Sequence, residues 1–187
     1  LHEMFEYITD FAMEVMKRAY EYIKIDAIEL EEDMAYKGAP MLSPDMFREF
    51  MLPHYRRFID FAKSNGTEII TIDCDGYPGG LIPLWIEAGA DAMSPCEIAA
   101  GVDLFEIRRQ YPGFGLLGGI DKRELAKSKR HIYDEVMGKV PRMIEKGGYI
   151  PHVDHAVPYD VSFENYSYFR QLMDRVAYGK TAEKPRE

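Results

Sequence analysis

Residues 68–88, EIITIDCDGYPGGLIPLWIEA, decide the fold because they contain a complete strand, turn and helix. β-Branched residues through 68–75 predict a strand, and glycines at 76–80 lead into a helix near 79–88. The strand ends in Asp73-Cys74-Asp75, which places two carboxylates and a thiol directly before the turn. The role of this acidic strand end is the main question that the sequence raises.

The same order of strand and helix repeats along the chain. An opening helix over 2–24 has apolar residues at steps of three and four, which predict one buried stripe of Phe5, Ile8, Ala12, Val15, Ala19 and Tyr22. Ser43-Pro44 begins a second helix that runs to 65 and that Pro53 is expected to kink. The remaining expected elements are strands at 25–34, 91–96, 114–120 and 148–154, and helices near 103–111, at 128–146 and from 162 to about 179.

Five strands that alternate with helices predict an α/β fold with a parallel sheet. One form is an eight-stranded (β/α)8 TIM barrel, of which this chain would be the C-terminal five βα units in a single domain, 1–187. The chain opens at Leu1 inside a helical pattern, so we expect an N-terminal part to be missing. The alternative is an open, doubly wound sheet.

Composition restricts the partners. The chain carries 23 basic and 32 acidic residues and a formal charge of −9, which argues against nucleic acid and against an anionic membrane. We find no apolar run long enough to span a bilayer and no signal sequence. Only Cys74 and Cys96 occur, which favours a reducing, cytoplasmic location.

Titratable side chains gather where the predicted strands end. In both candidate architectures ligands bind at the carboxyl ends of the strands. Alternation places Asp73 and Asp75 on one face of their strand and Cys74 on the other, among core residues. Two carboxylates on one face repel each other unless a cation lies between them or one is protonated; alternatively, Asp75 only caps the turn. The strand ends read Glu31-Glu32-Asp33, Asp73-Cys74-Asp75, Ser94-Pro95-Cys96-Glu97, Gly118-Gly119-Ile120-Asp121 and His152-Val153-Asp154-His155.

The last strand end adds imidazole to the carboxylates. His152 and Asp154 share a face by alternation, although Pro151 can introduce a bulge and leave open which histidine points inward. Carboxylates with imidazole form a plausible ligand set for Zn, Mn or Fe. The glycine pairs at 79–80 and 118–119 resemble phosphate-binding turns only weakly.

Several segments together resemble the uroporphyrinogen decarboxylase superfamily, in the right order from about 25 to 175. They are LSPDMFREFMLPHYRRFIDFAK (42–63), DCDG (73–76), GGID (118–121) and DHAVPYDVSFENY (154–166). The resemblance implies the eight-stranded barrel and two activities: decarboxylation of a porphyrinogen, or metal-dependent methyl transfer with a corrinoid protein.

In the methyltransferases of this superfamily a His, a Cys and a later Cys hold the metal. The resemblance places these three ligands at Asp73, Asp75 and His155. Zinc is the first metal expected, although carboxylate oxygens weaken the case for a zinc-activated thiol. In the decarboxylases a Gly-His-Gly segment matches at His155, but an Asp-Ser-Trp segment of that branch is absent.

We therefore predict an enzyme, first a methyltransferase whose divalent metal is held by Asp73, Asp75 and His155. Its catalytic candidates are Asp33, Asp154 and His155, with Glu32 and His152 near them. Its partners would be a small-molecule substrate and a corrinoid protein, and a homodimer is left open. The alternatives are a cofactor-free uroporphyrinogen decarboxylase of tetrapyrrole synthesis and a non-catalytic binding module.

Overall fold

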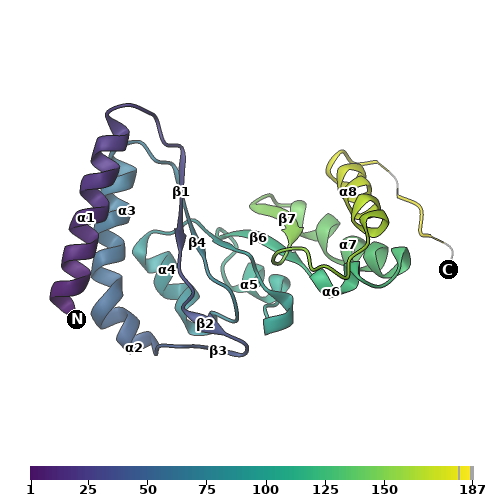
Figure 1. The fold of residues 1–187 in the computed structure, drawn as a ribbon, viewed down its shortest axis with the longest axis horizontal. Helices are drawn as coiled ribbons and strands as arrows, with labels where there is room; N and C mark the ends of the chain where they lie inside the picture. Colours follow the sequence, from purple (N-terminus) through teal and green to yellow (C-terminus); the bar gives the residue numbers. More distant parts are fainter. Residues whose placement is uncertain (181, 186–187) are drawn as a thin grey trace. The chain divides into compact units, whose positions relative to one another are not determined.

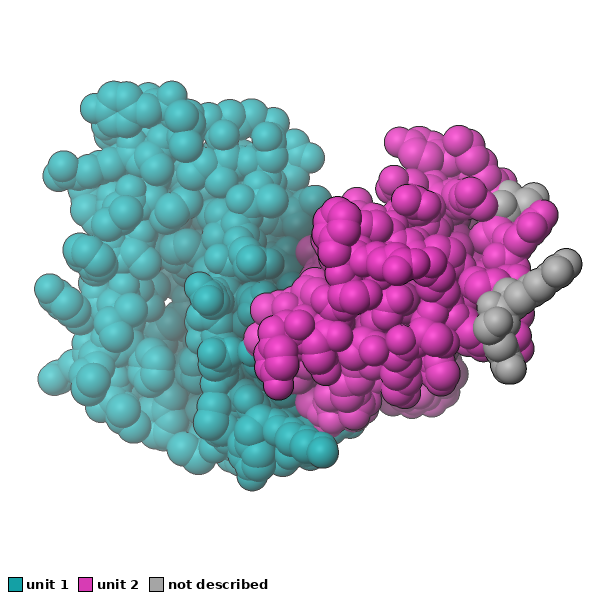
Figure 2. Space-filling model, turned by 45° about the vertical axis from the view of Figure 1, so that its right-hand side comes forward, with its two compact units in different colours: residues 1–94 teal, residues 95–187 magenta. Residues whose placement is uncertain are grey.

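The computed structural model describes residues 1–180 and 182–185, so the end of the predicted 1–187 domain lies partly outside it. The chain divides into two compact units, Leu1–Ser94 and Pro95–Glu187, coloured teal and magenta in Figure 2.

Three parallel strands form the sheet of the first unit. β4 (Ile69–Asp73) lies between β1 (Ala27–Glu31) and β5 (Ala92–Ser94), and all three run in the same direction. The register pairs Glu31 with Asp73 and Asp73 with Ser94. The three strands predicted in this part of the chain are confirmed.

Helices cover one face of this sheet. α1 (His2–Tyr20) lies beside α3 (Leu52–Ser64), and the short α4 (Ile82–Ala88) follows the 3₁₀ turn η2 (Gly79–Leu81) (Figure 1). Trp85 of α4 is completely buried, as are Ile70 and Ile72 of β4. The core of this unit therefore lies between β4 and its helices.

The helix predicted to bend at Pro53 is interrupted just before it. α2 (Pro44–Met46) starts with the Ser43 hydroxyl accepting from the Met46 amide, as predicted. A π-helical turn, η1 (Phe47–Met51), then separates α2 from α3. Proline lacks an amide hydrogen and its ring clashes with the carbonyl four residues earlier, so the wider turn replaces the expected kink.

The stripe predicted for the opening helix is partly wrong. Ile8 and Val15 are 58% and 51% exposed, and Tyr22, beyond the helix end, is 83% exposed. The buried position is Thr9, whose hydroxyl donates to the Phe5 carbonyl at 2.7 Å. This internal hydrogen bond satisfies the hydroxyl, so a polar residue occupies the centre of the packed face.

A small hairpin at 35–40 was not predicted. β2 (Ala35–Tyr36) pairs with β3 (Ala39–Pro40), and its backbone lies against the turn after β4. Gly76 has φ +82°, and a Cβ there would lie 2.8 Å from the Ala35 carbonyl carbon. The glycine of the DCDG segment therefore permits both a left-handed backbone and a close approach of two chain segments.

The second unit contains two parallel strands, and all of its predicted elements are present. Asp103, Asp121 and Ser162 cap three of its helices, and each side chain accepts from a backbone amide of the first turn. The elements are η3 (Ile98–Ala100), α5 (Leu104–Gln110), β6 (Gly115–Ile120), α6 (Lys122–Leu125), α7 (Lys129–Ile144), β7 (Tyr149–Val153) and α8 (Phe163–Ala177).

The glycine pair of β6 is required by packing. A Cβ on Gly118 would lie 1.9 Å from the Pro95 carbonyl oxygen, and the Gly119 amide donates to that oxygen at 3.0 Å. The Gly119 amide is thus already engaged, which removes the basis for a phosphate-binding turn here. The register across Pro151 is continuous from Tyr149 to Val153, so no bulge forms.

None of the helices in the described ranges combines the length and the apolar character needed to cross a membrane.

Replacing Gly76 with Ala tests the close approach to Ala35. We expect a loss of about 1–2 kcal/mol from the left-handed backbone and a further ~1–3 kcal/mol from the clash. Gly66→Ala is the matched control, because Gly66 has φ +95° and nothing lies within 4 Å of the position that a Cβ would take there. Urea unfolding, followed by the fluorescence of the single tryptophan Trp85, measures the stability of both variants. Equal losses for the two variants would contradict the packing explanation.

Candidate functional site

The sheet of the first unit has one apolar and one polar face. Ile70 and Ile72 are completely buried on the helical side, and the thiol of Cys74 follows them at 1% exposure. Asp73 lies on the opposite face, and the parallel register places Glu31 and Ser94 beside it on neighbouring strands. The predicted alternation, with Cys74 in the core, is therefore confirmed.

Asp73 is a half-buried carboxylate in acidic surroundings. Burial raises its pKa, and the neighbouring Glu29, Asp75 and Glu31 raise it further. A hydrogen bond with the Ser94 side chain opposes this rise. The polar face thus concentrates negative charge around Asp73, which favours either a proton or a cation there.

The other predicted acidic residues of this unit have different surroundings. Asp33 is exposed in the loop after β1. Glu32 lies one position beyond Glu31 and therefore turns toward the helical side, away from Asp73. The Cys74 thiol donates to the Asp75 carbonyl at 3.3 Å, and burial raises the pKa of this thiol to about 11. Cys74 is consequently a core thiol rather than a nucleophile.

Asp154 holds together the strand ends of the second unit. Its carboxylate is completely buried and accepts from the Ile98 amide at 2.8 Å and from the Lys122 amide at 3.1 Å. Burial raises its pKa, whereas the two amides oppose this effect. Because both oxygens bind backbone groups, Asp154 fixes the starts of η3 and α6; its predicted catalytic role stays a prediction.

A cationic group lies close to Asp154. The Lys122 ammonium pairs with Glu97 at 3.1 Å, and both side chains are about four-fifths buried. Asp121 caps α6 and pairs with Arg123 at 2.6 Å, which together lower its pKa despite burial. The strand ends of this unit thus combine acidic and basic groups, unlike the polar face of the first unit.

The two predicted histidines differ in exposure. His152 is half-buried, and its Nδ1 lies 2.7 Å from the Val153 carbonyl oxygen, so Nδ1 carries the proton in this contact. His155 is exposed in the loop after β7. The sequence left open which of the two histidines points inward. In the structure His152 lies against the protein and His155 faces solvent.

The predicted metal ligands fall in both units. Asp73 and Asp75 belong to the first unit and His155 to the second. Within the described part of either unit, no three His, Cys, Asp or Glu side chains come together as a metal site. The three-residue site stays a prediction.

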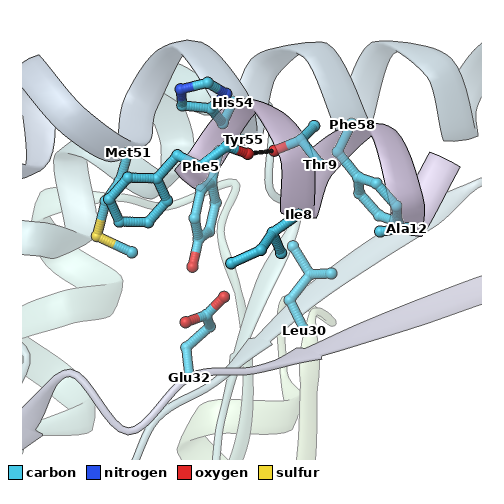
Figure 3. A pocket seen from close by; sticks show the side chains of 10 residues that line it. All are labelled: Phe5, Ile8, Thr9, Ala12, Leu30, Glu32, Met51, His54, Tyr55 and Phe58. Atoms are coloured by element: carbon cyan, nitrogen blue, oxygen red, sulfur yellow. Dashed lines mark hydrogen bonds between the residues drawn. The ribbon is translucent and has the colours of Figure 1, made fainter. Parts of the chain in front are cut away.

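Sequence reasoning missed one polar pair on the helical side of the first unit. Tyr55 of α3 is 8% exposed, and its hydroxyl points toward the Glu32 carboxylate (Figure 3). The signal was present at β1, where Ile28, Leu30 and, one residue past the strand end, Glu32 occupy alternate positions. That alternation places Glu32 on the apolar side.

Parallel strands, intervening helices and polar strand ends define an α/β protein of the kind that binds ligands at the carboxyl ends of its strands. A comparison with protein-family models matches residues 1–176 to uroporphyrinogen decarboxylase (URO-D), and the chain belongs to this family. A search of curated proteins found no match. Family membership confirms the predicted superfamily and the barrel fold class, to which the five parallel strands conform. It also supports an enzyme with decarboxylase-like activity in general terms.

Truncating Asp154 tests its role in the second unit. Asp154→Ala leaves two part-buried amides without acceptors, and we expect a loss of about 2–4 kcal/mol in the free energy of unfolding. The amide hydrogens of Ile98 and Lys122 should also exchange much faster. Asp160→Ala, at an exposed carboxylate of the following loop, is the control and should change neither quantity. Unchanged exchange at both amides in Asp154→Ala would contradict the assignment.

The raised pKa of Asp73 predicts a pH dependence of stability. A folded-state pKa above the usual 3.8 means that the folded state holds the proton more tightly than the unfolded state. The contribution of Asp73 to the free energy of unfolding is therefore most favourable below pH 3.8. It declines as the pH rises through the pKa that Asp73 has in the folded state.

Asp73→Asn should remove this decline and should be more stable than the native chain at pH 7. The measurement is urea unfolding by Trp85 fluorescence between pH 4 and 8, with Asp60→Asn on the exposed side of α3 as control. If the stability difference between the native chain and the Asp73→Asn variant does not change with pH, this account is contradicted.

Proposed function

We propose that this chain is a metal-dependent methyltransferase of the URO-D family. The observation that carries the proposal is the acidic polar face of the first unit. The charged groups that raise the pKa of the Asp73 carboxyl there are all acidic: Glu29, Asp75 and Glu31. A divalent cation would relieve this repulsion, whereas a polycarboxylate substrate would increase it.

The donor chemistry fits a hard divalent cation. Carboxylate oxygens suit Mg²⁺ and Mn²⁺ and also bind Zn²⁺. Asp73 and Asp75 would supply the oxygens, and the Ser94 hydrogen bond would keep the Asp73 side chain in a fixed orientation. When bound, such a cation lowers the pKa of a coordinated substrate group.

In this proposal the methyl donor is a corrinoid protein and the acceptor is a small molecule with an ionisable nucleophile. The protein's own contribution is the negative field of the polar face, which attracts the cation. The face also has the buried hydroxyls of Thr71 and Ser94, both under 8% exposed, which can orient a substrate.

Decarboxylation of a porphyrinogen is the second candidate, and Lys122 favours it. Its ammonium lies at the strand ends of the second unit and is held by Glu97 at 3.1 Å. A cation of this kind can bind a substrate carboxylate. Incubation with uroporphyrinogen followed by chromatography tests this activity, and loss of carboxyl groups from the product would support it over methyl transfer.

Metal titration of the 187-residue chain tests the first proposal. Asp73→Asn and Asp75→Asn should each weaken binding of Mn²⁺ or Zn²⁺ by tenfold or more, because each removes an anionic ligand. Asp60→Asn changes the net charge equally on an exposed helix surface and should leave the affinity unchanged. Calorimetry at fixed ionic strength provides the affinities. Native-like affinity in both site variants would contradict the ligand assignment.

A further inference from the structure

The first unit contains a pocket on the helical side of its sheet. The pocket lies between α1, α3 and β1 and has a volume of about 310 Å³ (Figure 3). Its walls are mainly apolar and include Phe5, Leu30, Met51 and Phe58. This volume is at the lower end of the range for small-molecule sites, which are typically apolar with a few polar groups.

Tyr55 provides an unsatisfied polar group in this pocket. The residue is 8% exposed, and its buried hydroxyl makes no hydrogen bond of normal geometry within residues 1–180 and 182–185, although its interaction with the Glu32 carboxylate affects the pKa of both groups. Thr9, the other hydroxyl in the lining, already donates to the Phe5 carbonyl at 2.7 Å. A buried hydroxyl without a partner is uncommon in folded proteins, and it indicates that a further group belongs beside it.

Glu32 supplies a charge at the same place. Figure 3 shows its carboxylate rising from the strand end toward the Tyr55 hydroxyl, with Met51 and Ile8 on either side of the space between them. Burial raises the pKa of Glu32, and the nearby Tyr55 hydroxyl opposes the rise. A carboxylate in such a site is stabilised most by a partner that brings a positive charge and donates hydrogen bonds.

We propose that this pocket binds a small primary ammonium compound with an apolar body. The ammonium would donate to the Glu32 carboxylate and to the Tyr55 hydroxyl oxygen, and the body would lie against Phe5 and Phe58. The aromatic rings add favourable interactions with a cation. The site uses the face of β1 opposite to Glu31, so it shares no side chain with the proposed metal site, although the Glu32 amide donates to the Asp73 carbonyl at 2.7 Å.

Calorimetric titration with 2-phenylethylammonium tests this inference. We expect a dissociation constant on the order of 0.1–1 mM for the native chain. The neutral analogue 2-phenylethanol has nearly the same shape and should bind at least tenfold more weakly, and the anion phenylacetate should not bind detectably.

Variants of the polar pair make the test specific. Glu32→Gln keeps the shape but removes the charge, and it should weaken ammonium binding about tenfold and abolish the preference over the alcohol. Tyr55→Phe should weaken it severalfold. Glu3→Gln changes the charge equally on an exposed position of α1 and should bind as the native chain does. Trp85 fluorescence verifies that each variant is folded.

Three results would overturn the proposal. They are no ammonium binding by the native chain up to about 10 mM, equal affinity for the ammonium and the alcohol, and unchanged ammonium affinity in a folded Glu32→Gln variant. The first would mean that water alone fills the space beside Tyr55. The second would mean that the pocket is a neutral apolar site.

Discussion

The alternation of side chains along β4 is the constraint on which the rest of the first unit depends. Each strand residue points to the face opposite to its neighbours. Ile70 and Ile72 therefore enter the core under the helices, and Thr71 and Asp73 are directed to the other side. Because β1 and β5 flank β4 in parallel register, their residues repeat this division. A slip of one residue would bury Asp73 and expose the isoleucines.

Backbone contacts then determine how the chain leaves each strand. Gly76 allows the turn after β4 to contact the backbone at Ala35, and Gly118 allows β6 to contact the Pro95 carbonyl. In the second unit the buried Asp154 carboxylate adds bonds to two loop amides. These contacts position the strand ends. Some residues that look catalytic or ligand-binding in the sequence therefore have a structural role instead.

The sequence predicted the repeated elements well because their periodicities are local. It predicted the core position of Cys74 for the same reason. The hairpin at 35–40 was missed because each strand has only two residues and depends on contact with the turn at Gly76. The helix stripe was misplaced because Thr9 satisfies its own hydroxyl within the helix.

The candidate site was less predictable because its partners are distant in sequence. Asp154 was correctly placed at a strand end, but its bond to Ile98 spans 56 residues and leaves no local signal. The Glu32–Tyr55 pair likewise joins a strand end to a helix. Glu32 was expected near the catalytic candidates, although alternation along the strand could have assigned it to the helical face; only packing shows which side chain lies opposite. Local pattern thus determines the face of a side chain, and tertiary contacts determine its partners.

We propose above all that the polar face of β4 and its neighbours attracts a divalent cation. Paramagnetic broadening of NMR signals by substoichiometric Mn²⁺ tests it most directly, because the broadening depends on proximity to the ion. We predict that the side-chain and amide signals of Asp73, Thr71 and Ser94 broaden first, while the methyl signals of Ile70 and Leu30 on the helical face persist. Equal broadening of both sets, or none at the polar face, would contradict the account.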